Sequence, residues 1–413
     1  MIRNLKSIIF IFTLLFTLLL TACGTTSQII NEPAENVPLT QAPDNENQHK
    51  KHDKDTITLL FAGDIMAHSV NYYITTYEKI WRDVRDVISE QDLAFANIEA
   101  PVDTTKPASS YPSFNMTRKY VQAAVDAGFD VFSLCNNHTN DQYKNGILET
   151  IKTTQAITEY TKQQFGNDIY FSGTKQNPSA ELSALTYNYF TANGWKILFL
   201  PITELLNRPD ASEYINFIKP TDESRKAFAK YAKELRQKNQ CDLFIISVHT
   251  SEPEYTRNIT ERQNQFYMDL LEAGADFVWA NHAHIIKDRK LVIDTKTGRD
   301  KLIMYANGNT ISGQRTKPEL TAKNPNGERD NTGDGLFYIV TMHREKDGSM
   351  KIKKCEPYFI TTYINTANEY VIKPLNQSFV DYLYDVPRTN WAKYIERRIK
   401  INKEATKDYI EWQ

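Results

Sequence analysis

The segment ITLLFAGDIMAH, residues 57–68, governs the architecture that we expect. Residues 57–62 form a near-continuous apolar run of strand length, which is typical of a strand buried on both faces. Gly63 and Asp64 follow at once, so a carboxylate stands where the strand ends. Because an aspartate after a glycine commonly caps a helix or forms a turn, Asp64 taken alone does not establish a site.

The same pattern recurs along the chain. Apolar runs predict further strands at residues 93–98, 131–135, 196–200, 243–248, 277–280, 301–305 and 336–342. Residues 228–235 and 266–271 have the three- and four-residue apolar spacing of helices between strands. Gly128 and Gly274 suit the left-handed position that closes a helix. This alternation of strands and helices predicts an α/β fold.

Polar side chains follow five of these strands where they end. The side chains are Asp64 and His68, Glu99, Asn137 with His138 and Asp141, His249, and His282 with His284. Since open α/β sheets bind ligands outside the carboxyl ends of their strands, we expect these residues to converge at one sheet edge. In an extended chain His282 and His284 would point the same way. A buried histidine is more often a core residue than a ligand, but the repetition favours a shared site.

The donor types indicate metal chemistry. Carboxylate and amide oxygens and imidazole nitrogens suit Mn, Fe or Zn, with Mg as a further candidate, and donor type does not choose among them. The donors outnumber the ligands of a single ion, whereas two divalent ions bridged by a carboxylate would use them all. Such a pair activates water near neutral pH and stabilises a negatively charged transition state.

Several blocks, in order over about residues 57–312, resemble the bacterial capsule-synthesis CapA family. They are Gly63 to Met66, Asn97 to Glu99, Ser133 to His138 with Asp141, His249 with Glu254 and Tyr255, Ala273 to Asp276, His282 to His284, and Tyr305 to Asn309. That family is associated with poly-γ-glutamate capsule production and is similar to calcineurin-like metallophosphatases. The chain departs from the family pattern beside the ligands, with Thr250 and Ser251 in place of Trp-Gly and Ala283 in place of a proline.

The resemblance implies a metallophosphatase-like layered sandwich, with central β-sheets flanked by helices, and a role for each polar residue. Asp64 and His284 look like ligands of one ion, and Glu99 like the bridge. The other ion would take Asn137, His249 and His282. His138 would face the substrate as general acid or charge stabiliser, with Asp141 beside it. His68 is a further candidate for the first ion, although it lies outside the family motif and also fits a plain core residue.

The first 23 residues predict the signal peptide of a lipoprotein. Arg3 and Lys6 precede an apolar run at residues 8–20, which is too short to remain as a membrane-spanning helix. The sequence LTACG, residues 20–24, resembles a lipobox, so we expect cleavage before Cys23 and lipid on that cysteine. The alternative is an ordinary secretory signal with a chance cysteine.

Residues 24–55 have no apolar periodicity and predict a disordered tether. The tether and the lipid imply a membrane-anchored lipoprotein outside the cytoplasm, at the cell surface or the periplasmic face. Residues 56–365 would form the main domain, and residues 366–413 a helical C-terminal extension with helices at 379–384 and 391–399. That extension either packs on the main domain or docks a partner.

The amino-acid composition limits the classes of partner and of fold that we expect. The net charge of −2 provides no basic footprint, which argues against nucleic acid. Aromatic residues make up 12% of the chain, which favours a globular body. With Cys23 lipidated, Cys135, Cys241 and Cys355 remain, so a disulfide framework is not expected, while one bridge stays open.

Three functions compete. The first is a surface metallohydrolase that cleaves a phosphoester or amide bond in an envelope polymer or its precursor. The second is a non-catalytic assembly or export factor that binds an anionic polymer. The third, a solute-binding lipoprotein, does not account for histidines at strand ends. The full ligand set favours the first, whose expected partners are the anionic polymer, the membrane, and membrane-bound synthesis or export subunits.

Overall fold

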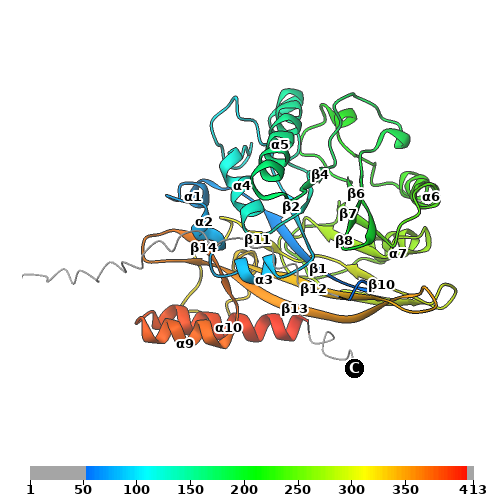
Figure 1. Cartoon of the computed structure of the whole chain (residues 1–413). Helices are drawn as coiled ribbons and strands as arrows, with labels where there is room; N and C mark the ends of the chain where they lie inside the picture. Colours follow the sequence, from blue (N-terminus) through cyan, green and yellow to red (C-terminus); the bar gives the residue numbers. More distant parts are fainter. Residues whose placement is uncertain (1–52, 407–413) are drawn as a thin grey trace, which may run out of the picture. The chain divides into compact units, whose positions relative to one another are not determined.

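Two β-sheets lie face to face, with helices on their outer faces, in the computed structural model of the chain (Figure 1). The structure describes residues 53–406, which belong to one compact unit. The signal peptide, Cys23 and nearly all of the tether lie outside the described residues, so the expectations for them stay predictions. Within residues 53–406, no helix is both long enough and apolar enough to cross a membrane.

The first sheet has the order β14-β13-β12-β1-β2-β3-β4, and β11 pairs with β1. Its strands are β1 (Thr56–Ile65), β2 (Leu93–Ile98), β3 (Val131–Ser133), β4 (Tyr170–Ser172), β11 (Asn309–Ile311), β12 (Asp334–Arg344), β13 (Met350–Ile364) and β14 (Tyr370–Pro374). Strands β1 to β4 are parallel, and β12 to β14 continue the sheet in antiparallel pairs. Both faces of β1 are buried, because it lies in the middle of the sheet.

The second sheet has the order β5-β6-β7-β8-β10-β9. Its strands are β5 (Asn188–Ala192), β6 (Trp195–Thr203), β7 (Leu243–His249), β8 (Phe277–Asn281), β9 (Arg289–Asp294) and β10 (Arg299–Met304). Strands β6, β7, β8 and β10 are parallel, while β5 and β9 are antiparallel edge strands. The sandwich of central sheets that the sequence predicts is therefore confirmed.

Aromatic side chains fill the space between the sheets. The rings of Phe61 and Phe95 in the first sheet stack at 4.8 Å, and Phe61 meets Phe277 of the second sheet at 5.4 Å. The indole nitrogen of Trp279 donates a hydrogen bond of 2.8 Å to the carbonyl of Ala62, on the opposite sheet. This bond joins the carboxyl half of β1 to β8, directly beside the polar strand ends.

Helices cover the outer face of each sheet, with α4 and α5 on the first and α6 and α7 on the second. The helices are α1 (Ser69–Tyr72), α2 (Glu78–Trp81), α3 (Arg85–Ser89), α4 (Arg118–Asp126), α5 (Tyr143–Phe165), α6 (Asp222–Lys238), α7 (Glu261–Glu272), α8 (Glu328–Asn331), α9 (Gln377–Asp385) and α10 (Thr389–Ala405), with 3₁₀ turns at Leu182–Ala184 and Ser212–Tyr214. Gly128 and Gly274 have φ of +112° and +108°, as expected where α4 and α7 end.

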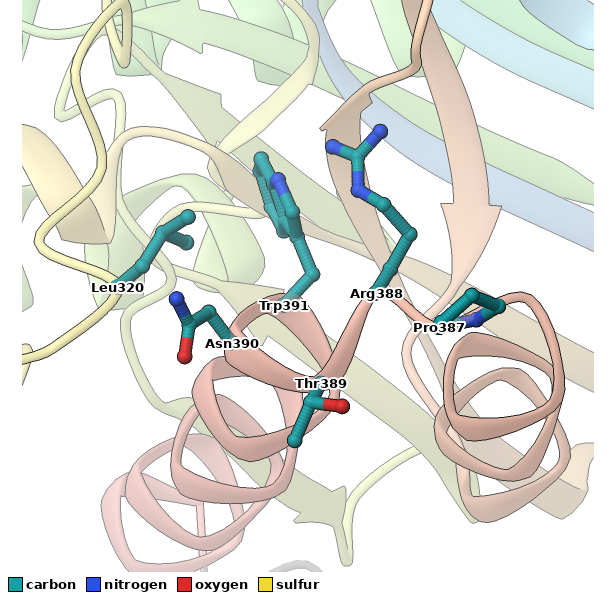
Figure 2. A pocket seen from close by; sticks show the side chains of 6 residues that line it. All are labelled: Leu320, Pro387, Arg388, Thr389, Asn390 and Trp391. Atoms are coloured by element: carbon teal, nitrogen blue, oxygen red, sulfur yellow. The ribbon is translucent and has the colours of Figure 1, made fainter. Parts of the chain in front are cut away.

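The two predicted C-terminal helices are α9 and α10, and they pack against β13 and β14 (Figure 1). Tyr363 of β13 contacts the rings of Phe379 and Trp391 at 5.2 and 4.9 Å. A pocket of about 340 Å³ lies between Leu320 and the turn from α9 to α10, as Figure 2 shows. The extension therefore packs on the main body, which is the first of the two alternatives that the sequence left open.

Candidate metal centre

The predicted donors converge at a place where both sheets end. Asp64 lies in β1, Glu99 follows β2 and Asn137 follows β3, all in the first sheet. His249 ends β7 and His282 follows β8, both in the second sheet. The expectation of one sheet edge is therefore wrong. Two sheets contribute because their parallel strands, held together by the aromatic layer between them, end on the same side.

Glu99 lies at the centre of these donors. Its Oε1 is 3.6 Å from His249 Nε2 and 3.8 Å from His284 Nε2. Asp64 Oδ2 is 3.4 Å from His284 Nδ1. These four residues are 0–2% exposed, so the cluster is almost completely buried.

Two groups of side chains place their ligand atoms within 4.8 Å of one another. One group is Glu99, His282 and His284, and the other is Asp64, Glu99 and His249. Glu99 belongs to both, which fits a bridging carboxylate. The family resemblance pairs Asp64 with His284 and His249 with His282 instead, so the division of ligands between two ions stays a prediction.

Four polar atoms of the cluster lack the hydrogen-bond partners that buried groups normally have. Within residues 53–406, no N–H or O–H group donates to either carboxylate oxygen of Glu99, and the Nδ1 atoms of His249 and His282 have no hydrogen-bond partner. Burial first, and then the Asp64 and Glu254 carboxylates, raise the pKa of Glu99 well above its ordinary value. Burial and the neighbouring imidazoles lower the pKa of His249, and that of His282 to about 3. A divalent cation would satisfy the oxygens of Glu99, so the residues fit a metal centre.

The two histidines after β8 reach the cluster through an unusual backbone. His282 and His284 have φ of +100° and +55°, which side chains with a Cβ rarely adopt. They therefore do not share the site as alternate residues of an extended chain, and that part of the expectation is wrong. Their ring centres are nevertheless 5.9 Å apart. The turn, rather than the strand, aims both imidazoles inward.

Two asparagines orient the ligands, and the sequence had assigned no role to either. Asn97 Nδ2 donates a hydrogen bond of 2.8 Å to Asp64 Oδ1. Asn309 Oδ1 lies 3.0 Å from His284 Nδ1, while its amide nitrogen donates to the carbonyl of Thr332 at 2.9 Å. His284 Nδ1 must then carry the proton, which leaves Nε2 free toward Glu99. Both asparagines fall inside the family motifs, and this was the only signal that could have found them.

His138 and Asp141 form a hydrogen-bonded pair beside the cluster. His138 Nδ1 is 2.7 Å from Asp141 Oδ2, which also accepts a hydrogen bond of 2.8 Å from the Phe114 amide. The Asn207 amide nitrogen is 3.1 Å from His138 Nδ1. Asn137 Oδ1 lies 2.8 Å from His249 Nε2, so Asn137 and His138 face different parts of the site. Asp141 thus acts through His138, because it fixes the orientation of the imidazole.

His68 lies on the wall of the site and outside the two candidate ligand groups. Its Nδ1 accepts a hydrogen bond of 3.1 Å from the Gly313 amide, and its ring meets that of Phe114 edge-on at 4.9 Å. Burial, followed by the charges of His284 and His138, lowers its pKa to about 3. The bond to Gly313 occupies one nitrogen, and the proposed role at the first ion stays a prediction.

A cleft of about 820 Å³ opens over the cluster. Asn137, His138 and His284 are buried residues that line it, so a substrate in the cleft would lie against candidate ligands. Tyr111, which is 73% exposed, stands at its mouth. Arg208 and Arg329 contribute positive charge to its walls. Sequence reasoning missed both arginines, since neither follows a predicted strand.

The sequence model of the family described as "Bacterial capsule synthesis protein PGA_cap" matches residues 58–314. The capsule biosynthesis protein CapA of Bacillus anthracis is 26% identical over 322 residues, covering 74% of this chain and 71% of that protein. The PGA biosynthesis protein CapA of Bacillus subtilis is 24% identical over 272 residues, covering 64% of this chain and 66% of that protein. The chain thus spans about two thirds of the length of these relatives.

Solved structures with a similar chain path have low sequence identity. A hypothetical protein from Thermus thermophilus is 16% identical with a TM-score of 0.43, covering 73% of this chain and 98% of that chain. The NAD nucleotidase NadN of Haemophilus influenzae is 11% identical with a TM-score of 0.41, covering 85% and 67%. The calcineurin-like phosphoesterase YfkN of Bacillus subtilis is 12% identical with a TM-score of 0.40, covering 83% and 99%.

Proposed function

Because the chain belongs to the bacterial capsule synthesis family whose model matches residues 58–314, we propose that it acts in synthesis, export or anchoring of an envelope polymer such as poly-γ-glutamate, as a two-metal hydrolase. One observation carries the hydrolase part of the proposal. Glu99 is a buried carboxylate without donors, among three buried histidines and beneath an open cleft. A fold that needed these groups only for stability would have paired them.

The metal ions would be held by Asp64, Glu99, Asn137, His249, His282 and His284. When bound, two such ions activate water and stabilise negative charge on the atom under attack. Asn97 and Asn309 keep Asp64 and His284 in the orientation that binding requires. The buried walls of the cluster exclude bulk water, so charge interactions within it are stronger than at the surface.

His138 supplies the proton chemistry in this proposal. Because Asp141 holds Nδ1 at 2.7 Å, Nε2 is the nitrogen left to exchange a proton with the substrate. His138 lies on the cleft wall and belongs to neither candidate ligand group. It can therefore donate to the leaving oxygen or nitrogen without releasing a ligand.

The proposal also places the protein on the outer face of a membrane, through lipid on Cys23. Residues 1–24 support this part of the proposal, because they contain a short basic segment, then an apolar run, and then the sequence LTACG. Membrane fractionation of a Cys23→Ala variant tests it. Release of mature protein, or retention of the uncleaved precursor, is expected, whereas unchanged processing and attachment would contradict the anchor.

The deciding experiment compares the full-length protein with His138→Ala. Each is assayed on a generic phosphodiester and on poly-γ-glutamate, with Mn, Zn and Mg each supplied. We expect the wild type to cut at least one substrate and His138→Ala to be about 10²–10⁴-fold slower, with unchanged metal content by elemental analysis. His343→Ala, at a histidine of β12 that pairs with Thr56 at the opposite end of β1 from Asp64 and is outside the cleft lining, is the matched control and should match the wild type.

Two outcomes contradict the proposal. If neither substrate is cut, yet both proteins restore polymer display in cells that lack the gene, the site binds or organises polymer and is not catalytic. If His138→Ala loses its metal, the residue is a ligand and its role as a proton donor is wrong.

A further inference from the structure

Arg329 lies on the wall of the cleft beside a candidate metal ligand. Its Nη1 donates 3.3 Å to the hydroxyl of Tyr255, and its guanidinium carbon is 5.0 Å from the centre of that ring. The Tyr255 ring is in turn 6.0 Å from the ring of His284, and the Tyr255 amide donates 3.0 Å to the carbonyl of Ala283. A single tyrosine ring therefore separates this cation from the metal centre.

The charge of Arg329 is not neutralised by the protein. Across residues 53–406, no carboxylate forms an ion pair with it, whereas Arg208 on the cleft wall pairs with Asp210 at 3.2 Å. The cleft thus contains an arginine whose positive charge is available to a bound molecule.

The two residues that follow Arg329 are hydrogen-bonded to α10. Its neighbour Asp330 accepts a hydrogen bond of 2.5 Å from the Tyr394 hydroxyl, and Asn331 accepts one of 2.8 Å from Arg398. Tyr394 and Arg398 are fully buried residues of α10. The exposed arginine side chain therefore extends from a fixed point on the wall, and does not belong to a loose loop.

The position and charge of Arg329 complement a polymer with repeated negative charges. The carboxylates of Asp141 and Glu254 also line the cleft, and they would repel an anionic chain. A guanidinium fork binds carboxylate or phosphate through charge-assisted hydrogen bonds and offsets this repulsion. We propose that Arg329, presented by Tyr255, binds an anionic group of the substrate adjacent to the group at the metal centre, and so selects polymers with negative charge on successive units. This inference rests on the proposed function.

Equilibrium binding tests the inference without turnover. The full-length, metal-loaded protein in the His138→Ala background is titrated with a γ-glutamate oligomer, a neutral γ-glutamine oligomer of equal length, and a glycerol phosphate oligomer. Adding Arg329→Gln should weaken binding of an anionic oligomer about tenfold and leave the neutral one unchanged. Arg329→Lys keeps the charge without the fork and should lose less affinity. Arg82→Gln, at an exposed arginine that follows α2 and lies outside the cleft lining, is the control and should bind as its parent does.

Each outcome bears on the inference directly. A loss confined to the γ-glutamate oligomer, or to the phosphate oligomer, supports it and names the anion. Equal affinity of Arg329→Gln and its parent for both anionic oligomers overturns it, as does an equal loss in Arg82→Gln or a parent protein that binds neither anion. Because the readout is affinity in a variant with strongly reduced turnover, the inference can fail while hydrolysis by the wild type stands, and the reverse also holds.

Discussion

Asp334 and Glu99 are both completely buried carboxylates, but their surroundings are opposite. Each oxygen of Asp334 accepts two hydrogen bonds from side chains, whereas within residues 53–406 Glu99 accepts none. The donors to Asp334 are Arg315 at 2.9 Å, Thr361 at 2.9 Å, Arg398 at 2.7 Å and Asn402 at 2.6 Å. The Asp334 cluster, named for this acid and these four donors, joins β12 to α10.

The pKa values of the two acids move in opposite directions. Burial alone would raise the pKa of Asp334, but the charges of Arg398 and Arg315 lower it below the ordinary value of 3.8. Burial and neighbouring carboxylates raise the pKa of Glu99. A buried acid whose ionised form is stabilised by its own protein holds the fold together. One that is left without donors beneath a cleft is prepared for a ligand from outside.

The largest effect is expected from Asp334→Ala. The change leaves two buried guanidinium groups without their shared carboxylate, and breaking such a pair costs about 3–5 kcal/mol. Denaturant unfolding of the full-length protein should show this loss as a lower midpoint. Asp347→Ala, at an exposed aspartate in the turn between β12 and β13, is the control and should have the same unfolding midpoint as the wild type. An unchanged midpoint in Asp334→Ala would mean that the Asp334 cluster does not hold α10 to the sheet.

Replacement of Glu99 is expected to change stability less than Asp334→Ala does, and in the metal-free protein to raise it. Metal at one hundred times its dissociation constant should stabilise the wild type by about 2.7 kcal/mol, and a chelator should remove that gain. Glu99→Gln should lose the response to metal, because the ligand shared by both candidate groups is gone. Without metal, and at a pH above the raised pKa of Glu99, it should be more stable than the wild type by about 1 kcal/mol, since a buried charge without donors has been removed.

Melting temperatures with and without metal measure both parts of this prediction. Glu356→Gln, at an exposed position of β13, is the matched control and should respond to metal as the wild type does. If the metal-free Glu99→Gln variant is less stable than the wild type, Glu99 stabilises the fold as Asp334 does.

The smallest expected effect is on the pH dependence of the unfolding free energy in acid. Because the pKa of Asp334 is lower in the folded state, its ionised form stabilises the fold above the ordinary value of 3.8, and this contribution is lost as pH falls through and below that value. Protonation leaves the donors in place, so less is lost than on removal of the side chain. In the Glu99→Gln background, where Glu99 cannot titrate, Asp334→Asn should flatten the decline of unfolding free energy below about pH 4. Parallel curves for the two proteins would contradict the lowered pKa.

Strands were predictable where both of their faces are buried. The apolar runs of β1, β2, β7 and β8 are visible in the sequence because every side chain packs against something. Strands β4, β5, β9, β11, β13 and β14 were not predicted. Most of these are short or lie at a sheet edge, and β13 is half-buried with lysines among its apolar residues. Such strands owe their conformation to the neighbour they pair with, which a local pattern does not identify.

The sequence by itself determined which donors stand at the ends of strands, because a strand and the residue after it are neighbours in the chain. Asp64, Glu99, His138 and His249 were found in this way. Only the tertiary structure decided that the ends of two sheets meet around Glu99, and that the backbone turns at His282 and His284 to complete the cluster. It also decided that Asp334 is paired while Glu99 is not, and that Arg329 reaches the cleft. These relations join residues dozens to hundreds of positions apart, and they exist only once the hydrophobic layers have brought the segments together.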